Sequence, residues 1–144
     1  MSLQIKNGTE CIDWNELDQV FQSAPLGGRP AEKFKKACEY SPVVVSVWSD
    51  NRIVGFGRAF TDFIGYASIY DVVVHKDFQG RGIGKKIMNS ILEQLKSCNY
   101  VTLFVAPGKS EFYSSFGFKS LKSGMILVNN DNFKEHLITR GHIE

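Results

Sequence analysis

Residues 72–86 read VVVHKDFQGRGIGKK, and they place a glycine-rich loop directly after an apolar run. Three glycines stand at alternate positions, Gly80, Gly82 and Gly84, so the backbone N–H groups can turn toward a ligand without a Cβ in the way. An amphipathic segment follows at once, and its first turn adds unpaired N–H donors and the positive end of a helix dipole. The segment therefore predicts a strand, an anion-binding loop that fits a diphosphate, and a helix.

Two common phosphate motifs do not fit the spacing of this loop. A dinucleotide fingerprint that starts at Gly80 needs glycine where Lys85 stands, and a P-loop needs glycine at Gln79. The remaining pattern, QGRGIG at residues 79–84, resembles the acyl-CoA pyrophosphate loop of the GNAT N-acetyltransferase superfamily. A glycine-rich connection that binds nothing is the alternative interpretation of the loop taken alone.

A second motif carries the same resemblance. GNAT proteins commonly have a Phe-Tyr pair four residues before a Gly-Phe, and residues 112–118 read FYSSFGF. Within the superfamily, several segments resemble the branch that contains the plant and bacterial arylalkylamine-type acetyltransferases. These segments are Trp14, Val45 to Trp48, Val54 to Phe56 and Tyr70 to His75.

The hydrophobic pattern predicts alternating strands and helices around both motifs. Strands are expected at residues 3–6, 42–48, 53–60, 66–74 and 100–105, with a final hairpin at 118–121 and 125–128. Helices are expected to begin at residues 13 and 30, to run from 83 to about 99, and to cover 110–116 and 132–139. Asp13, with Glu16 three residues later, predicts a capping box. This order gives an α/β protein with a mixed sheet, and it matches the GNAT fold nearly end to end, with splayed fourth and fifth strands and helices on both faces.

Length and charge limit the other classes of protein. A chain of 144 residues with 43% hydrophobic content is expected to form a single domain over residues 1–144. The net charge of +2 comes from 17 basic and 15 acidic residues spread along the sequence, so no nucleic-acid surface is expected. Cys11, Cys38 and Cys98 have no paired spacing, and reduced thiols without a metal site are expected. Without a leader pattern or a membrane span, the sequence predicts a cytoplasmic protein.

The resemblance implies where the cosubstrate, acetyl-CoA, would bind. Its pantetheine arm would enter between the splayed strands and pair with the backbone of the fourth strand, and its diphosphate would lie over the loop. The residues expected to bind it are Val72, Val73, Val74, Gln79, Gly80, Arg81, Gly82, Ile83, Gly84, Lys85, Ser110 and Tyr113. Many members carry an asparagine after the fifth strand where this chain has Ala106, so one cofactor contact is either missing here or replaced by Ser110.

The resemblance also implies two catalytic residues. Tyr113 would be the acid that protonates the departing thiolate, although its ring could instead only pack on the sheet. Asp71 is the best acidic candidate for the base on the fourth strand, since a carboxylate there could take the proton through ordered water. Some members place a glutamate one position earlier, where this chain has Tyr70, and this departure argues against direct base catalysis. His75 lies just past the strand as an alternative proton relay.

These observations predict an acetyl-CoA-dependent N-acetyltransferase that acts by direct transfer on a primary amine of a small molecule, with no metal and no membrane partner. Aromatic residues in the first two helices favour an apolar acceptor pocket, and hence an arylalkylamine. The alternatives are a protein or peptide lysine N-acetyltransferase and a non-catalytic acyl-CoA-binding domain. The sequence leaves the oligomeric state open, and because dimers are frequent in the superfamily a homodimer is one alternative.

Overall fold

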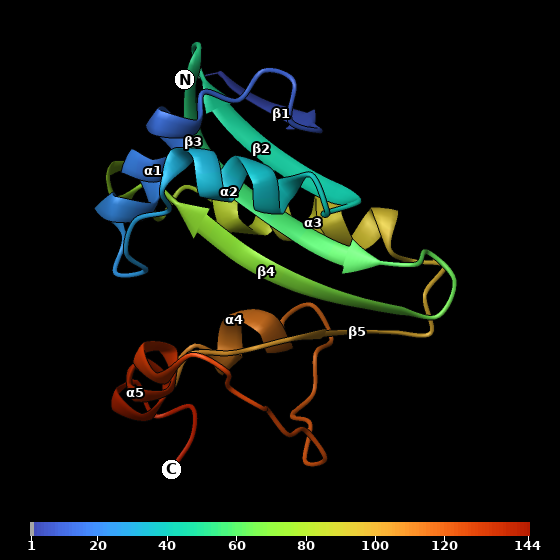
Figure 1. The fold of residues 1–144 in the computed structure, drawn as a ribbon. Coiled ribbons are helices and arrows are strands. Elements are labelled where there is room, and N and C mark those ends of the chain that lie inside the picture. Colours follow the sequence, from blue (N-terminus) through green and yellow to red (C-terminus); the bar gives the residue numbers. More distant parts are fainter. Residues whose placement is uncertain (1) are drawn as a thin grey trace. The chain divides into compact units, whose positions relative to one another are not determined.

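The computed structural model describes residues 2–144. The chain divides after Leu103 into two compact units. The first unit carries a five-stranded sheet in the order β1-β2-β3-β4-β5 (Figure 1). The strands are β1 (Leu3–Asn7), β2 (Val43–Ser49), β3 (Arg52–Thr61), β4 (Tyr66–Val74) and β5 (Tyr100–Leu103). Neighbours pair antiparallel except β4 and β5, which are parallel. The mixed α/β sheet with parallel fourth and fifth strands is thus confirmed.

The helices of this unit are α1 (Trp14–Ser23), α2 (Ala31–Cys38) and α3 (Ile83–Gln94), with the 3-10 turn η1 (Lys76–Phe78) before α3. Asp13 caps α1 as predicted, because its Oδ1 accepts the N–H of Asn15 at 3.0 Å and of Glu16 at 3.2 Å. The Glu16 carboxylate, however, accepts the N–H of Ile53 in β3 at 2.6 Å. The N-cap is confirmed, whereas Glu16 ties α1 to the sheet instead of closing a capping box.

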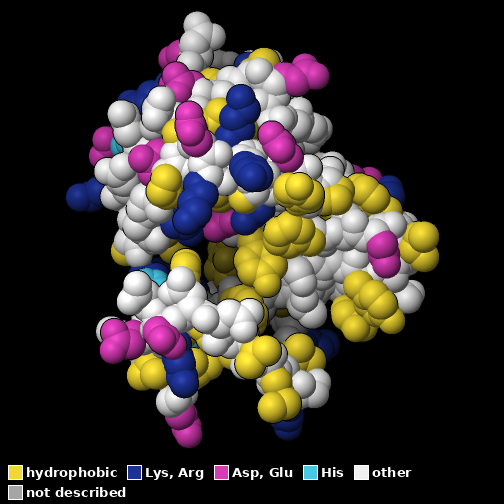
Figure 2. All heavy atoms as spheres, viewed as in Figure 1, with side chains coloured by type: hydrophobic (Ala, Val, Ile, Leu, Met, Phe, Trp, Pro, Cys, Tyr) yellow, Lys and Arg dark blue, Asp and Glu magenta, His cyan; other side chains and the backbone are white. Residues whose placement is uncertain are grey.

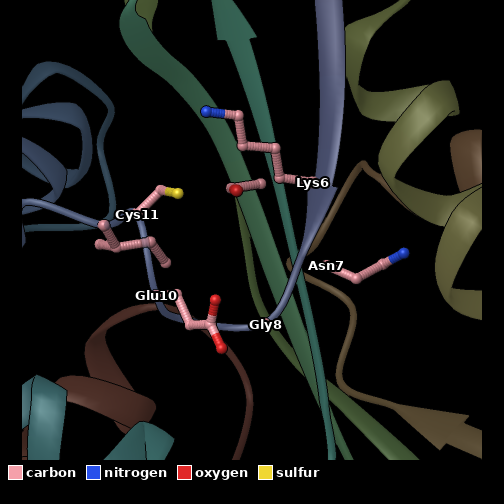
Figure 3. A pocket seen from close by; sticks show the side chains of 7 residues that line it. Lys6, Asn7, Gly8, Glu10 and Cys11 are labelled. Carbon is pink, nitrogen blue, oxygen red and sulfur yellow. The ribbon is translucent and has the colours of Figure 1, made fainter.

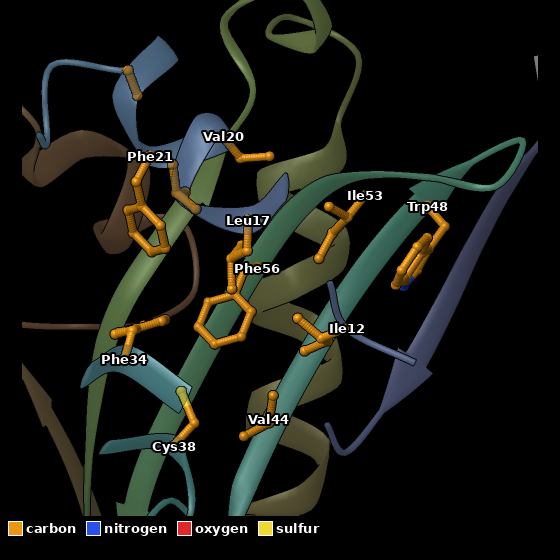
Figure 4. Close-up of a cluster of buried hydrophobic side chains, with 12 residues drawn as sticks. Ile12, Leu17, Val20, Phe21, Phe34, Cys38, Val44, Trp48, Ile53 and Phe56 are labelled. Carbon is orange, nitrogen blue, oxygen red and sulfur yellow. The ribbon is translucent and has the colours of Figure 1, made fainter. Parts of the chain in front are cut away.

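The main core lies between the sheet and the pair α1 and α2. Phe21 of α1, Phe34 of α2 and Phe56 of β3 meet there with ring centroids 5.4 to 6.1 Å apart (Figure 4). Edge-on packing of this kind buries large aromatic surface at favourable geometry. This cluster holds the two short helices against one face of the sheet.

Helix α3 covers the other face at close range. A Cβ at Gly57 would stand 2.8 Å from Cγ2 of Ile87, and one at Gly55 would stand 2.9 Å from Cγ2 of Ile83. Because real Cβ atoms do not approach so closely, glycine at both positions of β3 lets α3 lie directly on the strand. The expected helices on both faces are confirmed, and the start of α3 is fixed beside the end of β4.

The second unit, residues 104–144, contains α4 (Ser110–Ser114) and α5 (Asp131–Thr139). The predicted final hairpin is wrong, because residues 118–130 form no strand in the structure. Met125 and Leu127 are 99% and 86% exposed, so this segment has no apolar face to pack on, and an isolated hairpin without one is marginal in water.

No helix in residues 2–144 is long and apolar enough to cross a membrane.

Candidate active site

The loop between β4 and α3 adopts the conformation that its glycines predict. Gly80 and Gly82 have φ of +79° and +78°, a region that side chains rarely adopt, and Gly82 stands directly before the first residue of α3. No heavy atom lies within 4 Å of the place where a Cβ would stand at either glycine. The loop therefore needs glycine for its backbone shape, and the space beside it is open.

This loop presents unpaired donors. The first backbone bond of α3 runs from the N–H of Lys86 to the carbonyl of Gly82 at 3.1 Å. The N–H groups of Ile83, Gly84 and Lys85 precede it, and none of them has an acceptor among residues 2–144. Three unpaired N–H groups at the positive end of a helix dipole form a site for an anion such as a diphosphate.

Gln79 supports the loop from the strand side. Its Nε2 donates to the carbonyl of Val74 at 3.2 Å, which ties the start of the loop to the last residue of β4. The side chain therefore orders the loop. The structure thus places the predicted residues 79–82 in the loop after β4 and residues 83–85 in the first turn of α3.

Basic and aromatic side chains surround the turn before the loop. The guanidinium carbons of Arg52 and Arg81 lie 5.5 and 5.0 Å from the ring centroid of Phe78. Nη2 of Arg52 also lies 3.1 Å from Nε2 of His75. The N–H of Asp77 lies 3.1 Å from Nδ1 of the same ring. Because a neutral imidazole has one acceptor nitrogen, the ring accepts from only one of these two donors. Both ring nitrogens of His75 therefore face donors, and its relay role stays a prediction.

The free edge of β4 follows from its short pairing with β5. The two strands pair only from Tyr66 to Ile69 on the β4 side, so the second half of β4 has no neighbour in β5. The predicted residues Val72, Val73 and Val74 lie in this half, and the Val73 side chain is buried in the core. An extended segment of a ligand can add to such an edge through backbone hydrogen bonds.

Asp71 interrupts β4 as a bulge and forms a part-buried ion-pair cluster. Its φ is +58°, and the pairing of β3 with β4 shifts register at this point. Oδ1 accepts from Nε and Nη2 of Arg29 at 3.3 and 3.0 Å, and Oδ2 accepts from Nε of Arg58 at 2.7 Å. Only 13% of the Asp71 side chain is exposed. A carboxylate with three guanidinium hydrogen bonds has little capacity left to take a proton or to hold an ammonium, so its role as the base stays a prediction.

Arg58 is the central residue of this cluster. Its Nη1 donates to the hydroxyl of Ser41 at 3.0 Å and to the carbonyl of Ala37 at 3.4 Å, and its guanidinium carbon lies 5.2 and 5.0 Å from the ring centroids of Phe34 and Phe60. Its Nη2 has no partner among residues 2–144, and it is not buried. One nitrogen of this guanidinium, Nη2, therefore remains open to a ligand.

Cys38 lies at the end of α2 beside this cluster. Burial raises the pKa of its thiol to about 11, an effect that the Arg58 charge opposes and the Asp71 charge reinforces. The thiol is therefore protonated at neutral pH. Cys38 packs in the core and is not a nucleophile.

Tyr113 and Ser110 lie on α4 in the second unit. The N–H of Phe118 donates to the Tyr113 carbonyl at 3.3 Å, the N–H of Gly117 donates to the Ser114 carbonyl at 3.0 Å, and Gly117 has φ of +95°. This is a Schellman motif, and it fixes the backbone at Tyr113. Burial raises the pKa of the Tyr113 phenol, so the hydroxyl keeps its proton at neutral pH, as an acid must.

A hollow of about 310 Å³ lies on the opposite edge of the sheet, beside β1 (Figure 3). Lys6, Glu10 and Cys11 are among the residues that line it. None of the predicted site residues does. The hollow is therefore separate from the loop after β4.

Comparison with known proteins identifies the family. The model of the acetyltransferase (GNAT) domain matches residues 41–120. An uncharacterized N-acetyltransferase ycf52 of Porphyra purpurea is 38% identical over 118 residues, which cover 78% of this chain and 68% of that protein. Serotonin N-acetyltransferase 2, chloroplastic, of rice is 30% identical over 79% of this chain and 60% of its own length. Histone acetyltransferase TAP1 of soybean is also 30% identical, over 79% and 55%. The chain thus spans about two thirds or less of these relatives.

The fold gives the same answer. An acetyltransferase of the GNAT family from Streptococcus pneumoniae has a TM-score of 0.77 and 25% identity, with 90% of this chain and 99% of that chain covered. The family match includes β4, the loop and α3, which hold the open N–H donors described above. The chain belongs to the GNAT family of N-acetyltransferases.

Proposed function

We propose that the protein transfers an acetyl group from acetyl-CoA directly to a primary amine of a small molecule. The observation that carries the proposal is the loop after β4. Its three unpaired N–H groups, at Ile83, Gly84 and Lys85, precede the first bond of α3, and the space beside Gly80 and Gly82 is open. This arrangement suits the diphosphate of a coenzyme A ester.

The free edge of β4 supplies the next contact. Backbone groups of Val72 and Val74 lie between the bulge at Asp71 and the loop, in the half of β4 that β5 does not pair. An amide-bearing pantetheine arm fits such an edge as an added strand. The thioester at the end of that arm would then lie near the bulge.

Acetyl-CoA supplies an activated thioester, and the protein must manage two protons. The neutral amine attacks the carbonyl carbon, the C–N bond forms, the C–S bond breaks, and the thiolate takes a proton. We assign that donation to the Tyr113 hydroxyl, which burial keeps protonated. The nitrogen loses one proton before the attack and a second after the C–N bond has formed. Both pass to water, with Asp71 as the candidate for assisting, and water returns one proton to the Tyr113 phenolate, so the net release is a single proton.

Two relatives of equal similarity favour different acceptors. The rice relative is named for serotonin and the soybean relative for histone, and both are 30% identical to this chain. Exposed aromatic residues beside the Asp71 bulge, Phe60 and Tyr70, favour a small amine with an aromatic body. Acetylation of protein lysines is the second candidate, and the soybean relative supports it.

The test is acetyl-CoA turnover, detected as released thiol, with arylalkylamines, polyamines, amino sugars and a lysine peptide as acceptors. We expect an arylalkylamine to be acetylated fastest. A tenfold preference for the lysine peptide would favour the second candidate. Binding of acetyl-CoA without turnover on any acceptor would leave a non-catalytic acyl-CoA-binding domain.

A further inference from the structure

We propose that the acceptor carries a carboxylate, bound by Nη2 of Arg58, and an aromatic body that lies on the rings of Phe60 and Tyr70. This inference rests on the proposed function, because it names the class of amine that the same site takes. It follows from which hydrogen-bonding groups of the ion-pair cluster are already used, and from where the unused one lies.

Arg29, the first guanidinium of the cluster, has every nitrogen engaged. Its Nη1 donates to the carbonyls of residues 26–28, and its Nε and Nη2 donate to Oδ1 of Asp71. These bonds lock Arg29 into the segment between α1 and α2. Arg29 therefore fixes Asp71 in place and is not the group that meets a ligand.

Arg58 differs from Arg29 in one nitrogen. Its Nε is used by Asp71 and its Nη1 by Ser41 and Ala37, while Nη2 has no partner among residues 2–144 and is not buried. A guanidinium has no acceptor, so the ligand group at this point must accept a hydrogen bond. An ammonium is excluded there, because both groups donate and both are positive.

The charges of the cluster select an anion. Two guanidinium groups share the single Asp71 carboxylate. The nearby Asp18 is directed to the backbone N–H of Arg29 and to the side chain of Gln22, not to Arg58. Because only 12% of the Arg58 side chain is exposed, little water screens its charge. A ligand carboxylate would form a charge-assisted bond there, the strongest that a guanidinium makes.

Arg58, which carries the open donor, lies beside the exposed residues Phe60 and Tyr70. Arg58 pairs with Tyr70 across β3 and β4, one residue before the bulge at Asp71. The rings of Phe60 and Tyr70 meet edge to face at 5.5 Å and stay 37% and 36% exposed. Figure 2 shows basic side chains beside a patch of hydrophobic side chains on this face. A flat apolar body can cover the two rings while its carboxylate reaches Arg58.

The experiment compares acceptors that differ only in the carboxylate. We would measure kcat/KM for 2-phenylethylamine, L-phenylalanine and 4-(2-aminoethyl)benzoate, with tyramine as the neutral oxygen analogue and the triamine spermidine as the polycation. We expect at least one carboxylated amine to exceed 2-phenylethylamine by tenfold or more. Tyramine is expected to have a lower kcat/KM than that carboxylated amine, and spermidine is expected to be the poorest acceptor.

Variants then assign the preference to Arg58. In Arg58→Lys, the lysine ammonium is drawn to Asp71 and no second nitrogen remains to bind the carboxylate of the acceptor. The preference for carboxylated amines should therefore fall at least tenfold. Ser41→Ala is the matched control, because Ser41 contacts Nη1 and not Nη2, and the preference should stay within twofold. Three outcomes would each overturn the proposal. One is a carboxylate preference that is retained in folded Arg58→Lys. The others are wild-type rates for the carboxylated amines that equal the rate for 2-phenylethylamine, or that equal the rate for tyramine.

A binding measurement separates this inference from the proposed function. The ligand is 3-phenylpropanoate, which has the ring and the carboxylate but no amine, and 3-phenylpropan-1-ol is its control. Selective binding of the carboxylate, lost in Arg58→Lys, would support the subsite even if no acceptor were acetylated. Equal or absent binding of both compounds would overturn it, even if acetyl transfer to other amines were found.

Discussion

The loop at residues 79–85 and the ion-pair cluster around Asp71 lie at the two ends of the same half of β4, yet they are built in opposite ways. The loop leaves its N–H donors at Ile83, Gly84 and Lys85 unpaired and open. In the cluster, both oxygens of Asp71 are paired, and Nη2 of Arg58 is the nitrogen left open. A site of unpaired donors gains its partners only from a ligand, whereas a paired cluster already stabilises the fold.

The largest expected effect is that of Asp71→Asn on stability. The change removes the shared carboxylate and leaves Arg29 and Arg58 facing each other with a neutral amide between them. Breaking a buried ion pair by removing one partner costs on the order of 3 kcal/mol, and urea unfolding without ligand should show a loss of that size. A loss below about 1 kcal/mol would mean that the cluster contributes little to folding.

The same variant separates a base from a positioning residue. If Asp71 takes the proton from the amine, the rate of Asp71→Asn should recover in part at high pH, where free amine is abundant. If Asp71 only holds Arg58 and the bulge, the rate should be reduced by the same factor across the pH range. The measurement is a pH profile of kcat on the soluble, folded variant.

Tyr113→Phe should lower turnover about 10²-fold or more, the usual range for loss of a general acid. The ring contacts with Phe112 and Phe118 are kept, so the unfolding free energy and the affinity for acetyl-CoA should stay close to those of the wild type. Parallel losses of stability and activity would favour packing as the role of the ring. Wild-type turnover would mean that another group or water supplies the proton.

The pH profile of the wild type checks the state of Tyr113. Burial raises the pKa of the phenol, so the acid form persists above the ordinary tyrosine value of about 10. Between pH 7 and 9.5 the rate should therefore rise with the fraction of free amine and show no falling limb. A fall within that range that Tyr113→Phe removes would contradict the raised pKa.

Gly82→Glu tests the open side of the comparison. Acetyl-CoA at a hundredfold over its dissociation constant should stabilise the wild type by about 2.7 kcal/mol, and the variant should lose most of that shift. The new carboxylate repels the diphosphate, and φ of +78° strains any side chain at this position. Gly8→Glu is the matched control, since Gly8 has φ of +86° and open space around it but lies at the end of β1. An undiminished shift in Gly82→Glu would exclude the loop as the cofactor site.

The two regions also differ in how far the sequence reveals them. All the parts of the loop are contiguous, so the glycine spacing, the apolar strand and the helix start could be read together, and the structure keeps them in that order. The cluster joins residues 42 and 13 positions apart, Arg29 and Arg58 to Asp71, and no local pattern links them. The bulge at Asp71 is equally hidden, because aspartate is only modestly enriched at left-handed φ and the apolar pattern of the strand continues on both sides of it. Asp71 was found as a candidate, whereas its partners were missed.

Burial explains which predicted elements formed. Each of the five predicted strands of the first unit formed within a few residues of its expected limits, because alternating side chains meet α3 on one face and α1 and α2 on the other. Residues 118–121 and 125–128 have strand-like composition, but within their unit the side chains of Leu121, Met125 and Leu127 are exposed. Strand propensity mainly measures packing on a half-buried surface, so composition alone did not give a hairpin.

The smallest expected effect is that of Asp13→Ala. Asp13 belongs to neither the loop nor the ion-pair cluster, so its loss shows how much stability an ordinary polar contact contributes. Asp13 accepts the N–H groups of Asn15 and Glu16 at the start of α1, and loss of such a cap costs about 1 kcal/mol. Urea unfolding should show that loss, with the stabilisation by acetyl-CoA and the carboxylate preference both unchanged. If this variant lost as much stability as Asp71→Asn, the first unit would respond alike to any polar deletion, and the cluster would have no special weight. If it lost the acetyl-CoA shift as well, helix α1 would be coupled to the loop through the sheet, and the two regions could not be treated as separate.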